Sequence, residues 1–129
     1  MEDKTQIIAA LDDIRVKNKL VVVEGIKDKA ALSRLEITNV FAINRTPMYK
    51  VVEHVALAAK EVVLLVDLDD EGRKLYHLLA QDLQRHKVKI DNTLRDLLSK
   101  TSLRHIEGLD SFLERAEIKE KEEIKKKKN

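Results

Sequence analysis

The fold of this chain is decided by residues 64–73, which read LLVDLDDEGR. The apolar start of this stretch continues from Val62 and Val63, and a short aliphatic run of this kind is typical of a strand buried on both faces. Two aspartates, Asp67 and Asp69, follow the run directly, and Gly72 ends the acidic segment. Because side chains along a strand repeat every second residue, we expect the two carboxylates to face the same opening.

A second aliphatic run ends in the same way. Leu20–Val23 is followed by Glu24 and Gly25. Helical patterns separate the two runs, which predicts right-handed crossovers and a mainly parallel sheet. In open sheets of this class, ligands bind at the carboxyl ends of the strands. We therefore expect Glu24 to lie near Asp67 and Asp69, although they are far apart in sequence.

The rest of the chain alternates helical and extended patterns. Helices are expected over 2–17, 27–35, 48–60, about 75–86, 94–98 and 109–116, and further short strands over 39–43 and 88–90. The expected fold class is α/β, with a Rossmann-like arrangement of about four mainly parallel strands flanked by helices. One domain would span 18–113, with 1–17 as an N-terminal helix packed on it and 114–129 as a charged Lys/Glu-rich tail, which could either solvate the terminus or contact nucleic acid.

Composition limits the classes of function. The 129 residues suit one domain, and a content of 43% hydrophobic and 37% charged residues excludes disorder of the whole chain. The absence of cysteine excludes disulfides, cysteine-bound zinc and thiol nucleophiles. No signal peptide and no apolar run near the roughly 20 residues that cross a bilayer are seen, so we expect a cytoplasmic protein without a membrane partner. The net charge of +2 does not by itself indicate a nucleic-acid partner.

The acidic residues indicate a metal site. Carboxylates brought together repel one another unless a cation intervenes or one of them is protonated. Glu24, Asp67 and Asp69 offer only oxygen ligands, which favours a hard cation, Mg2+ first and Mn2+ as the alternative.

Glycine and basic residues flank these acids. Gly25 and Gly72 are expected to shape loops that admit a phosphate and a metal, since glycine permits close approach. Lys27, Arg73 and Lys74 stand at the starts of the helices that follow, where phosphate is also attracted by free amides, and we expect them to contact phosphate.

Two other families of motifs contain similar acidic segments, and neither matches this one. A calcium-binding helix-loop-helix would need Glu at the position of Leu78, and a haloacid-dehalogenase motif would have Thr or Val where Glu71 stands. A structural role stays open, in which the segment caps the following helix, above all through Asp70 and Glu71. The histidines show no metal-ligand spacing and are expected to be surface or packing residues; they are His54, His77, His86 and His105.

Two stretches together resemble the signature motifs of the Toprim family. Residues 21–28, VVVEGIKD, match a hydrophobic strand followed by Glu-Gly-x-x-Asp, and residues 64–73 match a hydrophobic strand followed by Asp-x-Asp-x-x-Gly. The resemblance covers about residues 18–110, including IEGL at 106–109. The chain is most similar to small stand-alone Toprim proteins of the primase-like kind and to those like the ribonuclease that matures 5S ribosomal RNA.

This resemblance implies a function. Glu24 would act as a general acid or base or as a metal ligand, while Asp67 and Asp69 would hold Mg2+. No topoisomerase tyrosine domain, primase zinc module or ATPase domain is found within the sequence. We therefore expect a Mg2+-dependent enzyme acting on nucleic-acid phosphodiesters, a nuclease or related phosphoryl-transfer enzyme, with RNA processing as one candidate. The alternative is a module with weak or no catalysis that binds nucleic acid or a partner protein.

Overall fold

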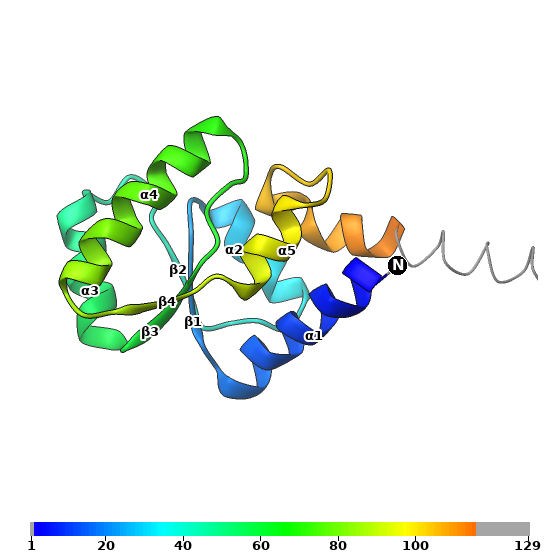
Figure 1. Ribbon diagram of the computed structural model, residues 1–129, viewed down its shortest axis with the longest axis horizontal. Helices are drawn as coiled ribbons and strands as arrows, with labels where there is room; N and C mark the ends of the chain where they lie inside the picture. The colour runs from blue at the N-terminus through cyan, green and yellow to red at the C-terminus, as the bar shows by residue number, and fades with distance from the viewer. Residues whose placement is uncertain (1, 116–129) are drawn as a thin grey trace, which may run out of the picture.

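The computed structural model describes residues 2–115, in which four strands form one parallel sheet (Figure 1). The strands lie in the order β2-β1-β3-β4, and every neighbouring pair is parallel. Their bounds are β1 Leu20–Val23, β2 Val40–Ala42, β3 Glu61–Leu64 and β4 Lys89–Asp91. The α/β class and the four parallel strands expected from the sequence are confirmed.

Helices cover both faces of the sheet, as Figure 1 shows. On one face lie α3 and α4, and on the other lie α1, α2, α5 and the short 3-10 helix η1. Their bounds are α1 Glu2–Lys17, α2 Ile26–Arg34, α3 Met48–Ala58, α4 Asp70–Arg85, α5 Thr93–Ser99 and η1 Ile106–Gly108. Residues 109–115 continue as a helix, and most of the expected tail, 116–129, lies outside the described residues.

The alternation of β1 explains the two cores. All four of its side chains are buried; Val21 and Val23 pack with α1, α2 and α5, while Leu20 and Val22 pack with α3 and α4. A strand covered on both faces needs apolar residues at every position, which is why it reads as an uninterrupted aliphatic run.

Several expected boundaries are wrong by one or two residues, and α4, expected from about residue 75, begins at Asp70. The strand expected over 62–66 ends at Leu64, although the Leu65 amide still donates to the Val22 carbonyl at 2.8 Å and both Leu65 and Val66 are buried. Helix α3 ends at Ala58 because Ala59 is extended, with φ of −156°. Val88 is not in β4, since its amide donates to the Leu83 carbonyl and closes the end of α4.

Membrane-spanning helices are not found in the part of the chain that the structure describes. None of its helices combines the length and the apolar character that crossing a bilayer requires.

The buried aliphatic run predicts a specific stability difference between two leucines. Leu65 is fully buried in the core that α1, α2 and α5 form with the sheet, whereas Leu57 is 84% exposed. We expect Leu65→Ala to lower the free energy of unfolding by about 2 to 5 kcal/mol, because a cavity is left in the core. Leu57→Ala serves as the matched control and should change it by less than about 0.5 kcal/mol. Urea unfolding of both variants checks this, and equal losses would contradict the assigned core.

Candidate functional site

The carboxyl ends of β1 and β3 bring Glu24 and Asp67 together. The two strands are neighbours, with Leu20 beside Val62 and Val22 beside Leu64, so they end at the same level of the sheet. The backbone amide of Asp67 donates to Oε2 of Glu24 at 3.4 Å. Both side chains are partly buried. The proximity that the parallel arrangement predicts is therefore present.

Glu24 is a carboxyl with a strongly raised pKa at this edge. Burial, and then the carboxylate of Asp67 beside it, raise the pKa of Glu24 from 4.5 to about 7. Asp28 adds to the effect with its own charge. At neutral pH the Glu24 side chain can therefore both give and take a proton, which is the property that a general acid or base requires.

Asp67 is held by the segment that leads into η1. Its Oδ1 accepts the amide of Ile106 at 3.0 Å, and its Oδ2 lies 3.3 Å from Nδ1 of His105. The Leu68 amide donates to the Arg104 carbonyl at 2.8 Å, which fastens residues 104–106 to the acidic loop. Two segments far apart in sequence thus share one site.

His105 joins the two aspartates. Its Nδ1 lies 3.9 Å from Oδ2 of Asp69, and one ligand atom each from Asp67, Asp69 and His105 fall within 4.8 Å of one another. Hydrogen bonding to Asp67 raises the pKa of His105. The side chain is 58% exposed, as expected for a surface residue, but its place in the cluster was not expected. The ligand set is therefore not restricted to oxygen.

Glu24 stands outside that cluster of three, although it touches Asp67. The expected triad of Glu24, Asp67 and Asp69 is thus present as two linked parts, a pair and a cluster, which have Asp67 in common. This division favours an acid-base role for Glu24 over a role as metal ligand.

Asp69 also caps a helix. Its Oδ1 accepts the amide of Gly72 at 2.8 Å, so it is the N-cap of α4. The capping role considered for Asp70 and Glu71 therefore belongs to Asp69. Asp70 instead pairs with Arg73 on the surface, and Glu71 is exposed.

The two glycines expected to shape the loops differ. A Cβ atom on Gly72 would lie 2.0 Å from the carbonyl oxygen of Asp67, so only glycine fits against the acidic loop. A Cβ atom on Gly25 would lie 3.8 Å from Asp28, an ordinary contact, and φ at Gly25 is −139°. The protein's own packing requires Gly72 but not Gly25.

Arg95 was not expected at the site. Its side chain is buried, with only 6% of the residue exposed; Nη1 donates to the carbonyl of Val66 and Nη2 donates to that of Asp67 at 3.1 Å. The guanidinium also lies over the ring of Tyr76, 4.6 Å from its centroid. Burial lowers the pKa of Arg95, whereas the charges of Glu24 and Asp67 raise it. Arg95 thus holds in place the backbone of Val66 and Asp67, just after β3.

Asp28 is a further acid at this edge. It accepts the Gly25 amide at 3.0 Å as part of the capping box of α2, and burial raises its pKa. Three residues were expected to contact phosphate. Lys27 and Lys74 are exposed, and Arg73 lines a polar pocket together with Leu68 of the acidic loop. Neither lysine side chain forms an ion pair within residues 4–115.

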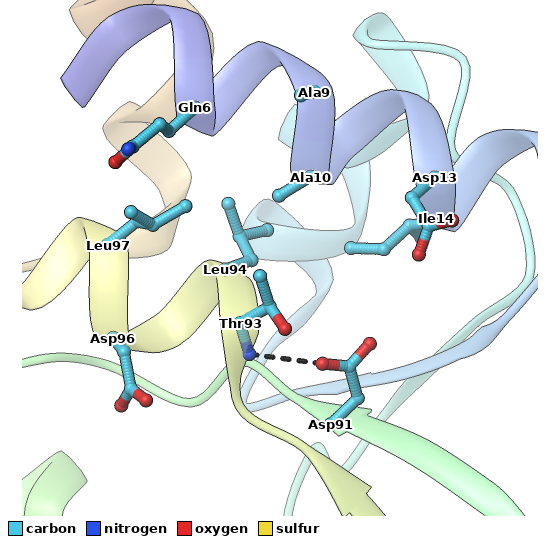
Figure 2. A pocket seen from close by; sticks show the side chains of 10 residues that line it. All are labelled: Gln6, Ala9, Ala10, Asp13, Ile14, Asp91, Thr93, Leu94, Asp96 and Leu97. Atoms are coloured by element: carbon cyan, nitrogen blue, oxygen red, sulfur yellow. Dashed lines mark hydrogen bonds between the residues drawn. The ribbon is translucent and has the colours of Figure 1, made fainter. Parts of the chain in front are cut away.

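A cavity of about 550 Å3 lies apart from these groups, between α1 and α5 (Figure 2). Its walls are mostly apolar, and Asp13, Asp91 and Asp96 stand at its margin. Lys19 pairs with Asp13 at 3.1 Å and with Asp91 at 2.7 Å, and Lys17 also pairs with Asp13 at 2.9 Å, so two of these carboxylates already have cationic partners. Glu24, Asp67 and Asp69 are not among the residues that line it.

The glycine contacts predict an asymmetry between two substitutions. Gly72→Ala should lower the free energy of unfolding by about 1 to 3 kcal/mol, because the new methyl group forces the backbone of Asp67 to move. Gly25→Ala, the matched control, should change it by less than about 1 kcal/mol. Thermal and urea unfolding measure both. Similar losses in the two variants would contradict the close approach assigned to Gly72.

The raised pKa of Glu24 predicts that the free energy of unfolding, measured with a metal chelator present, depends on pH. The folded protein keeps the Glu24 proton up to about pH 7, whereas the unfolded chain releases it near 4.5. The free energy of unfolding should therefore fall as pH rises between these values, by on the order of 2 kcal/mol for this partly buried group. Glu24→Gln should remove that fall. Urea unfolding against pH tests this, and an unchanged profile in the variant would refute it.

Comparisons with known proteins agree with this architecture. The sequence is 28% identical to a UPF0292 protein of Thermococcus sibiricus, over 86% of this chain and 88% of that protein. It is 30% identical to a UPF0292 protein of Pyrococcus abyssi, over 81% of this chain and 79% of that protein. A solved structure of a protein from Aquifex aeolicus superposes with a TM-score of 0.72 at 29% identity, covering 80% of this chain and 94% of the other.

The profile of the Toprim domain matches residues 18–93, from the start of β1 to the start of α5. Both acidic segments, with Glu24, Asp67 and Asp69, fall inside the matched region. The chain belongs to the Toprim domain family.

Proposed function

We propose that this protein is a metal-dependent enzyme that acts on phosphodiester bonds of nucleic acid, as a nuclease or a related phosphoryl-transfer enzyme. The observation that carries the proposal is the convergence of Glu24, with a pKa of about 7, and the cluster of Asp67, Asp69 and His105 at one sheet edge. An acid-base group and a set of cation ligands thus lie side by side, in a family whose domains act on nucleic acid.

The residues present fit a divalent cation. Two carboxylates and an imidazole converge within 4.8 Å, and Asp67 and Asp69 each use one oxygen for a backbone amide while the other lies toward His105. Asp67 and Asp69 would hold the cation and His105 could complete the set, which suits Mn2+ at least as well as Mg2+. Such a cation supplies charge neutralisation of the phosphate and a lower pKa for the attacking water.

Glu24 would move the proton. At neutral pH part of the population carries an ionised Glu24, which can accept a proton from water or from a hydroxyl held at the adjacent phosphate. The protonated form can in turn give a proton to the leaving oxygen. Asp28, buried behind it and bonded to the Gly25 amide, keeps the loop that carries Glu24 in place.

A second candidate function is supported by one observation. Asp69 caps α4 and Asp67 receives the Ile106 amide, so both acids have structural partners within the protein itself. A module that binds nucleic acid or a partner protein with weak or no catalysis would need no more than this. The metal-dependent assay below separates the two candidates.

We expect Asp67→Asn to abolish Mn2+ binding and any Mn2+- or Mg2+-dependent cleavage, with little change in folding stability, since Asn removes the charge but keeps an acceptor for the Ile106 amide. The measurements are a calorimetric Mn2+ titration and cleavage of a panel of structured RNAs and DNAs.

Asp70→Asn is the matched control, because Asp70 is the adjacent exposed acid outside the cluster. It should bind metal and cleave as the wild type does. Equal Mn2+ affinity of wild type and Asp67→Asn would refute the metal site, and Mn2+ binding without cleavage of any substrate would favour the binding module.

A further inference from the structure

Three arginines line a pocket beside the acidic loop, residues 67–69. The pocket is lined by Leu68, Arg73, Arg95, Asp96, Ser99 and Arg104, and we call it the arginine pocket. Its volume is about 180 Å3. It is formed by the 67–69 loop, the first turn of α4, helix α5 and the segment before η1. None of its residues belongs to the cluster of Asp67, Asp69 and His105.

The arginine pocket and the acidic site share one short loop. Leu68, which lines the pocket, stands between Asp67 and Asp69 in the chain. The Leu68 amide is bonded to the Arg104 carbonyl, and Arg95 donates to the Asp67 carbonyl. A group bound in the pocket would therefore sit one residue away from the acids along the backbone.

Two of the three guanidinium groups are fixed before any ligand arrives. Arg95 is buried and donates to the carbonyls of Val66 and Asp67, just after the end of β3. Nη1 of Arg104 donates to the carbonyls of Thr101 at 2.9 Å and Leu103 at 2.7 Å. Groups that are already ordered lose little conformational entropy when they bind. Arg73 is exposed and pairs with Asp70.

Charge and size indicate the ligand. Three arginines and a single carboxylate, Asp96, line the pocket, and its positive charge exceeds its negative charge even though Arg73 also pairs with Asp70, so the pocket favours an anion. The volume is below the roughly 300 Å3 at which pockets for whole small molecules begin, which suits a phosphate group better than a complete nucleotide. Arginine is the side chain whose planar donors match phosphate oxygens.

We propose that the arginine pocket binds a phosphate group of the nucleic-acid strand whose neighbouring phosphate is handled at the Asp67 cluster. The inference rests on the proposed function for its substrate class, and it adds a second contact that sets the register of the strand. The bound phosphate belongs either to the backbone or to a strand terminus.

The first experiment uses inorganic phosphate as the probe. In 15N-labelled wild-type protein with chelator present, phosphate should cause saturable shifts at the Leu68 and Ser99 amides and at the arginine Nε–H signals. The double variant Arg73→Gln, Arg104→Gln should lose these shifts. Arg95 is left intact, because its removal would leave the Val66 and Asp67 carbonyls without their donor. Absence of saturable shifts in the wild type would overturn the pocket.

The second experiment measures affinity for short oligonucleotides, with and without a 5′-phosphate, at several salt concentrations. Arg73→Gln and Arg104→Gln should each weaken binding about tenfold and lower the slope of log affinity against log salt by about 0.7 for single strands. If removing the 5′-phosphate lowers the affinity of the wild type but not that of the variants, the bound phosphate is a terminal one. If removal leaves the wild-type affinity unchanged, the bound phosphate belongs to the backbone.

Arg85→Gln is the matched control. Arg85 forms the same i, i+3 pair on the same helix, with Asp82, but does not line the arginine pocket. It should bind oligonucleotides within twofold of wild type. Equal losses in Arg73→Gln and Arg85→Gln would overturn the pocket in favour of a diffuse charge effect. Phosphate binding here, with no Mn2+ binding at Asp67, would leave the pocket standing while the proposed enzyme function fails.

Discussion

The parallel pairing of β1 with β3 is the constraint on which the rest of the structure depends. Val22 lies beside Leu64, so the two strands finish together and their following residues emerge at one edge. The pairing is stabilised by apolar side chains on both faces, and Val22 and Leu64 are fully buried. The hydrophobic layers on either face of the sheet thereby hold two carboxylates close enough for Asp67 to raise the pKa of Glu24.

That edge would be unfavourable without the groups that surround it. Glu24, Asp28 and Asp67 are partly or fully buried acids, and burial raises the pKa of Glu24 and of Asp28. Two cationic side chains lie beside these acids, the buried guanidinium of Arg95 and the exposed imidazole of His105. Neither is part of the two signature segments, so the electrostatic balance of the site comes from the region of the chain that follows them.

Features set by neighbouring residues could be predicted from the sequence, whereas contacts between residues far apart in sequence could not. Local patterns predict the two aliphatic runs and the acids that follow them. A general rule about alternating strands and helices then predicts that the strands are parallel, and the structure confirms this. Arg95 and His105 lie 28 and 38 residues from Asp67 in sequence, and no spacing rule joins them to it. One signal for Arg95 was available: it shares with Leu94 and Leu98 the buried face of α5, where an arginine must have partners. Strand ends were misplaced because Leu65 and Val66 are buried without belonging to the ladder.

Asp69 has two functions in the structure, and this has a mechanical consequence. The carboxylate that lies in the ligand cluster also holds the first turn of α4, a helix of 16 residues and therefore about 24 Å long. A ligand that binds both oxygens of Asp69 would compete with the Gly72 amide for Oδ1 and so weaken that turn. Since α4 packs on α3, this cap hydrogen bond connects the acidic loop to the helices on that face of the sheet.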